Sequence, residues 1–141
     1  MTTKELILAA LASGGSNATF LPVHVQKLFF LLDREGSHLL DGPHFHFVPY
    51  DYGPFDSSVY DRLDFLRVEG LVSVDAAGRF RRYSLTPEGR SFGLQILQTL
   101  PAATQKFIGD TAAWVSRLSF QQLVAAIYRR YPEMKANSIF R

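Results

Sequence analysis

Cysteine is absent from this chain of 141 residues, which excludes disulfides, thiolate zinc sites and cysteine nucleophiles and fits a reducing compartment. Long apolar runs are absent too, since no uninterrupted stretch approaches the ~20 residues that a membrane-spanning helix needs. Residues 1–5 (MTTKE) lack the basic and then apolar layout of a secretory signal. From these absences we expect a cytoplasmic protein with no membrane segment.

A strong charge of either sign is also missing. Fifteen Lys and Arg against thirteen Asp and Glu leave a net charge of +2, which is low for a dedicated nucleic-acid binder. The basic residues are unevenly placed, because six of them lie between Arg62 and Arg90 and three fall within residues 79–82. Hydrophobic residues make up 47% of the chain and charged residues 20%, a composition typical of one ordinary globular domain.

Motifs of catalysis are lacking as well. The sequence contains no glycine-rich phosphate loop, no GxSxG nucleophile turn and no HExxH zinc helix. We therefore expect no enzymatic activity and no cofactor. The nearest approach to a metal motif is His44-Phe45-His46, whose imidazoles would share one side of a strand. Without cysteine or a second histidine pair, this pattern favours two ordinary histidines over a metal site.

What the sequence does contain is a succession of helix starts and stops. Residues 2–5 and 119–122 fit capping boxes, in which a Ser or Thr oxygen and a Glu or Gln side chain satisfy free N–H groups at a helix start. Pro22 can open a second helix with a wide apolar face, which Gly36 should end. Residues 45–48 alternate weakly and predict a short strand or an extended arm. Residues 50–54 favour a turn, with Gly53 free to adopt positive φ.

The middle of the chain predicts a helix, a hairpin and another helix. Asp56 is a good N-cap for a helix that buries Val59, Leu63 and Leu66 and ends at Gly70. Residues 71–74 and 80–85 predict two strands around a turn at residues 75–78. In the second strand, alternation would place Arg79 and Arg81 on one face. Thr86 and Pro87 then predict the start of the next helix.

The last third is helical by its apolar periodicity. One stripe comprises Phe92, Ile96, Leu97 and Leu100, and a second follows Pro101. Together these elements predict a mostly helical α+β protein. It consists of a winged helix-turn-helix domain with a two-stranded wing in residues 1–92, and of a helical extension in residues 93–141 that packs on the domain or forms a homodimer.

Several segments resemble known proteins. Those that resemble uncharacterised phage-associated proteins and the Panacea (SocA-like) antitoxins are residues 26–31 (QKLFFL), 50–55 (YDYGPF), 59–60 (VY), 69–72 (EGLV) and the tail 118–132. Residues 83–89 (YSLTPEG) are similar to the wing-to-helix junction of MarR- and PadR-type regulators. The resemblance implies a winged-helix fold and either a DNA-binding repressor or a protein that neutralises a toxin.

The leading hypothesis for function is a DNA-binding regulator of transcription, dimeric and cytoplasmic. The residues expected to contact double-stranded DNA are Ser57, Ser58 and Arg62 in the groove and Arg79, Arg81 and Arg82 on the phosphates. The helix predicted over residues 56–69 disfavours this hypothesis. Its four carboxylates and two arginines give the helix a net charge of about −2, which phosphates repel.

The alternative is a protein-binding module of antitoxin or phage-associated type that does not bind DNA. In that case the acidic helix would bind a basic partner such as a toxin. The residues expected to anchor the partner are Tyr50, Tyr52, Phe55 and Asp61.

Overall fold

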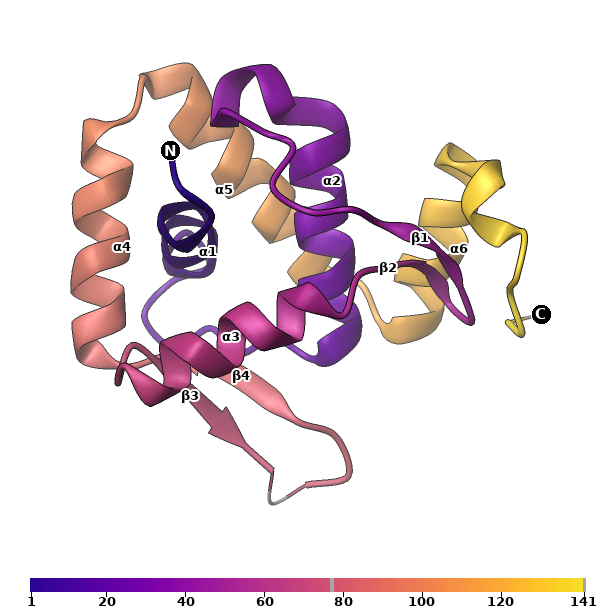
Figure 1. Cartoon of the computed structure of the whole chain (residues 1–141), viewed down its shortest axis with the longest axis horizontal. Coiled ribbons are helices and arrows are strands. Elements are labelled where there is room, and N and C mark those ends of the chain that lie inside the picture. The colour runs from indigo at the N-terminus through magenta and orange to yellow at the C-terminus, as the bar shows by residue number, and fades with distance from the viewer. Residues whose placement is uncertain (77, 141) are drawn as a thin grey trace.

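The computed structural model describes residues 1–76 and 78–140. These residues form six α-helices, a short 3₁₀-helix and two two-stranded antiparallel sheets (Figure 1). The helices are α1 (Thr3–Ala12), α2 (Pro22–Leu40), α3 (Ser58–Val68), α4 (Pro87–Thr99), α5 (Ala102–Arg117), α6 (Phe120–Arg130) and η1 (Pro132–Lys135). The strands are β1 (Val48–Tyr50), β2 (Gly53–Phe55), β3 (Val72–Asp75) and β4 (Arg82–Leu85). The prediction of a mostly helical α+β protein is confirmed.

The core is built around α1, which α2, α4 and α5 surround (Figure 1). Every residue of α1 from Leu6 to Ala12 is buried, so this helix is covered on all sides. Helix α2 buries most of its length as well, and α5 contributes Ile108, Ala112 and Val115 to the same cluster. Within the described part of the chain, no helix is long and apolar enough to cross a membrane.

The predicted capping boxes are confirmed. Thr2 Oγ1 accepts from Glu5 N at 3.1 Å while Glu5 Oε1 accepts from Thr2 N at 2.8 Å. Ser119 and Gln122 make the same reciprocal pair at the start of α6. Thr86 caps α4, with Pro87 as the first helical residue. Each of these starts depends on residues a few positions apart, which is why the sequence alone indicates them.

The predicted end of the second helix at Gly36 is confirmed in part. Gly36 leaves helical geometry with φ of −131° and kinks the chain, but helical turns resume after it and α2 extends to Leu40. Gly36 is required for packing, because a Cβ there would lie 2.2 Å from Cε2 of Phe107 on α5. The helix ends instead at Asp41, which adopts the left-handed conformation with φ of 55°.

The strand predicted over residues 45–48 lies further along the chain. β1 pairs with β2 in the register Val48↔Phe55 and Tyr50↔Gly53, and Gly53 has φ of 99°. The predicted turn role of residues 50–54 is therefore confirmed. The residues before β1 pack by their rings instead, since Phe47 meets Phe30 edge to face with ring centroids 5.6 Å apart.

The predicted wing forms a hairpin, β3–β4, whose first strand lies one residue later than expected and whose second strand is shorter. Strand β4 begins at Arg82, so Arg79 and Arg81 precede it and their predicted alternation along a strand is wrong. Ala77, in the predicted turn, lies outside the described residues. Tyr83 in β4 also exchanges two 2.8 Å backbone hydrogen bonds with Phe20, which joins the segment before α2 to the hairpin.

The stripe predicted on α4 is confirmed in part, because Ile96, Leu97 and Leu100 pack against the core but Phe92 does not, and two glycines make the closest approach. Phe92 is 52% exposed, whereas Gly89 and Gly93 are buried. A Cβ on Gly93 would lie 2.4 Å from the Leu8 carbonyl oxygen of α1, and a Cβ on Gly89 would lie 1.9 Å from the Leu71 oxygen. Residues without a side chain thus let the two helices approach closely, a relation that apolar periodicity does not reveal.

Candidate functional site

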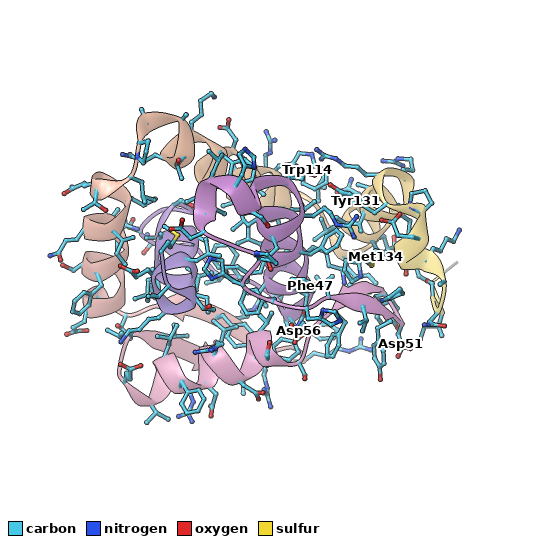
Figure 2. The ribbon with its side chains drawn as sticks, turned by 45° about the horizontal axis from the view of Figure 1, so that its top comes forward. Phe47, Asp51, Asp56, Trp114, Tyr131 and Met134 are labelled. Atoms are coloured by element: carbon cyan, nitrogen blue, oxygen red, sulfur yellow. The ribbon has the colours of Figure 1, made fainter. Side chains whose placement is uncertain are left out.

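The start of α3 is fixed by a buried glutamine on α2. Gln26 Nε2 donates to Asp56 O and Gln26 Oε1 accepts from Asp56 N, both at 2.9 Å. The Asp56 carboxylate in turn accepts from Ser58 N at 2.8 Å and from His46 N at 2.7 Å. The predicted contact of the Asp56 carboxylate with Ser58 N is confirmed, but the N-cap of α3 is Ser57 and not Asp56. Figure 2 shows Asp56 where the chain enters α3.

The two faces of α3 differ sharply in character. Val59, Leu63 and Leu66 point inward and are buried, as predicted. One stripe on the outer face carries Asp61, Asp64, Phe65 and Val68, at the spacing that aligns residues along a helix. Phe65 is 67% exposed and Val68 is 72% exposed. The sequence reasoning placed Asp61, and Asp64 or Phe65, on the outer face but missed Val68, which the spacing relative to the buried residues indicates.

The six residues expected to contact DNA fall into two groups. Ser57 and Arg62 are exposed near the start of α3, whereas Ser58 is half-buried and its N–H is taken by Asp56. Arg79, Arg81 and Arg82 are all exposed. The Arg79 guanidinium lies over the Phe80 ring, 5.4 Å from its centroid.

A cavity of about 600 Å³ lies between the start of α2, the β1–β2 hairpin and residues 79–80. It brings together three of the residues expected to bind a protein, Tyr50, Tyr52 and Phe55, but not Asp61. Tyr50 stacks on Phe55 with centroids 5.0 Å apart, and Tyr52 meets Phe120 of α6 edge to face at 4.9 Å. The aromatic rings therefore come from segments that are far apart in the sequence.

The wall of this cavity contains a lysine that the sequence reasoning missed. Lys27 is 3% exposed, and its Nζ donates to the Pro54 carbonyl oxygen at 3.2 Å. Burial lowers the pKa of the Lys27 amine from 10.5 to about 7, because the apolar surroundings penalise the charged form. The available signal was a lysine on an otherwise apolar helical run, VQKLFFLL.

The histidine pair shows a structural role for His44. Its Nε2 donates to the Leu40 carbonyl at 2.6 Å and its Nδ1 lies 3.0 Å from Thr3 Oγ1, so both ring nitrogens face protein groups. Its backbone N–H donates to the buried Asp33, and desolvation raises the pKa of that carboxyl group. His46 is exposed. In the part of the chain that the structure describes, no three His, Asp or Glu residues cluster as metal ligands would.

A scan of this chain against models of known protein families gives no match, and a search of curated proteins gives none either.

Proposed function

We propose that this chain is a winged helix-turn-helix protein that binds a basic segment of another protein through the outer face of α3. Support for the scaffold comes from the element order: α1, an extended residue bonded to the hairpin at Phe20, α2, α3 and the hairpin β3–β4. That order is the one expected of a three-helix core followed by a wing. The chain departs from a tight helix-turn-helix, because residues 41–57 and the β1–β2 hairpin separate α2 from α3.

The observation that carries the proposed partner is the exposure of Phe65 and Val68 beside Asp61 and Asp64. Large apolar side chains clustered on a surface and bordered by charge mark protein interfaces. Asp64 already forms an ion pair with Arg67 at 2.9 Å, so Asp61 is the carboxylate that most favours a partner with a lysine or arginine beside an apolar anchor. Both carboxylates disfavour DNA at this face, because they would repel its phosphates. A toxin is the kind of partner that the resemblance to antitoxins implies.

Site-specific photo-crosslinking in the host cells tests this proposal. With p-benzoylphenylalanine in place of Phe65, we expect one dominant protein adduct. The matched control carries the same group in place of Phe92, which is also exposed but lies on α4, and should not give that adduct. Reversing both carboxylates (D61K/D64K) should remove the adduct while the circular dichroism spectrum stays unchanged. An adduct that persists after charge reversal would contradict the proposal.

Binding of double-stranded DNA by the wing is a second candidate, favoured by the exposure of Arg81 and Arg82 on a hairpin that projects from the helical body (Figure 1). A salt titration of anisotropy with mixed-sequence duplex DNA tests it. Micromolar affinity that falls steeply with salt, and is lost in R81E/R82E, would support DNA binding. No binding at 50 mM salt would exclude DNA binding by the wing, and protein binding would remain as the proposed function.

A further inference from the structure

We propose that the aromatic cavity beside Lys27 binds a small organic monocarboxylate, whose apolar body lies against the rings and whose carboxylate contacts the Lys27 amine. This inference does not depend on the partner of α3. It rests on the shape of the cavity, on the chemistry of its walls and on the burial of one amine within them.

The cavity has the dimensions of a small-molecule site. Its volume of about 600 Å³ falls in the range of roughly 300–1,000 Å³ that is typical of ligand pockets. Five separate parts of the chain form the walls: the start of α2, the β1–β2 hairpin, α3, the wing and α6. Tyr52, Phe80 and Phe120 are each at least 37% exposed. A flat apolar ligand would cover surface that these rings now present to water, which favours binding.

Lys27 supplies a charge that this cavity does not neutralise. Among residues 1–76 and 78–140, the Pro54 carbonyl is the only hydrogen-bond acceptor within reach of its Nζ, and no carboxylate lies within ion-pair distance. An ammonium group has three N–H donors, so two of them lack a protein acceptor. Burying such an amine is costly without a counter-charge. A bound carboxylate provides both the counter-charge and the missing acceptors.

The other groups around Lys27 limit the ligand to a single negative charge. Asp51 and Arg79 are the charged neighbours in the cavity wall, and their charges offset each other. The remaining polar groups are tyrosines or are already bonded: Tyr50, Tyr52 and Tyr60 in the wall, Tyr128 beside Gly53, and Gln26, whose amide holds Asp56. One uncompensated amine therefore matches a monocarboxylate better than a phosphate or a dicarboxylate.

Isothermal titration calorimetry of the full chain with 2-naphthoate, and with the uncharged 2-naphthamide as its matched probe, tests the proposal. At pH 6 we expect the acid to bind at least tenfold more tightly than the amide. The affinity for the acid should fall about thirtyfold by pH 8.5, because the Lys27 amine of pKa about 7 must then take up a proton on binding. Heats measured at pH 7.5 in phosphate and in Tris should differ by that proton uptake.

Two variants separate the amine from the walls. K27M should lose the preference for the acid over the amide, while K106M, which removes an exposed lysine paired with Asp110, should keep it. F80A removes an exposed ring and should weaken both probes equally by several-fold. Absence of millimolar binding by 2-naphthoate, equal binding of the two probes, or a preference retained by K27M would overturn the proposal. If K27M fails to fold, the parent chain alone decides: binding of 2-naphthoate without proton uptake would overturn the proposal.

Discussion

At the scale of single residues, the absence of a side chain at Gly93 allows α4 to approach α1 closely. A Cβ there would lie 2.4 Å from the Leu8 carbonyl oxygen and 2.6 Å from Ala12 Cβ, so α4 would have to move away from α1. We expect G93A to reduce the free energy of unfolding by about 3 kcal/mol, as overpacking of a core does. Urea denaturation followed by circular dichroism measures this change.

Gly109 provides the matched control for that variant. It also lies inside a helix, α5, but a Cβ there would meet nothing within 4 Å. G109A should therefore stabilise the protein by about 1 kcal/mol, the difference in helix propensity between alanine and glycine. Equal effects of the two substitutions would show that α4 does not depend on close approach to α1.

A second effect at the residue scale is the pH dependence that Lys27 imposes on folding. Its pKa is about 7 in the folded chain and about 10.5 when exposed, so between these values the unfolded state binds more protons. Stability should therefore rise with pH across this window, and the penalty of the buried amine is largest below pH 7. K27M removes the titrating group.

The test of that linkage compares the two proteins by urea denaturation at pH 6, 8 and 10. We expect the advantage of K27M over the parent chain to shrink with rising pH, by on the order of a few kcal/mol in total. A difference in free energy of unfolding that stays constant from pH 6 to pH 10 would contradict a lowered pKa for Lys27.

At the scale of the element, local sequence was enough where the cause was local. The caps at Thr2, Thr86 and Ser119 and the inward face of α3 were predicted correctly, because a few neighbouring residues determine each of them. The end of α2 was predicted only in part. Gly36 kinks the helix, but the turns that follow it to Leu40 were not foreseen, and Phe107 from the distant helix α5 occupies the space beside Gly36.

Less of the candidate site could be predicted, because contacts between residues distant in the sequence form it. The tyrosines of the β1–β2 hairpin were predicted from their type to anchor a protein partner in the alternative hypothesis, and the structure places them in the wall of the cavity. Lys27 was missed because its burial depends on Pro54 and on the hairpin that covers it. The exposed pair on α3 follows from the helical spacing once Val59 and Leu63 are known to be buried.

The contact between Gln26 and the backbone of Asp56 positions the start of α3, and its removal can be tested. Its side-chain amide bonds both backbone groups of Asp56, and it is 2% exposed. Q26L keeps the approximate volume but leaves the N–H of Asp56 unpaired, whereas its C=O still accepts from Val59 N at 3.1 Å. We therefore expect a loss of about 2 kcal/mol. Hydrogen exchange should show faster opening of residues 56–60 than of α5. Protection of those residues that is unchanged in Q26L would assign the position of α3 to its apolar face alone.

At the scale of the whole molecule, the predicted boundary at residue 92 falls inside α4 (Pro87–Thr99). The β1–β2 hairpin, α6 and the C-terminal segment gather at one end of the molecule, and α4 lies at the other (Figures 1 and 2). Ile139 N donates to Asp51 O at 2.9 Å, which attaches that segment to the hairpin. The proposed ligand cavity and the outer face of α4 are therefore separate surfaces.

This separation allows the predicted homodimer to be tested without disturbing the cavity. Gly89 and Gly93 turn one face of α4 toward the core, which leaves Phe92 52% exposed on another. A two-fold contact between α4 helices would bury this ring against its symmetry mate. We expect the parent chain to sediment as a dimer and F92D to sediment as a monomer, because a buried aspartate at the axis would face its own copy.

The affinity for 2-naphthoate is the internal control for the dimer experiment. F92D should bind the acid as the parent chain does, since Phe92 is not part of the cavity wall. Sedimentation of the parent chain as a monomer at all concentrations would contradict the dimer, and α4 would then present Phe92 to water or to a different partner. A dimer that survives F92D would place the contact elsewhere, and the exposed face of α3 would be the next surface to change, because Phe65 and Val68 are more exposed than Phe92.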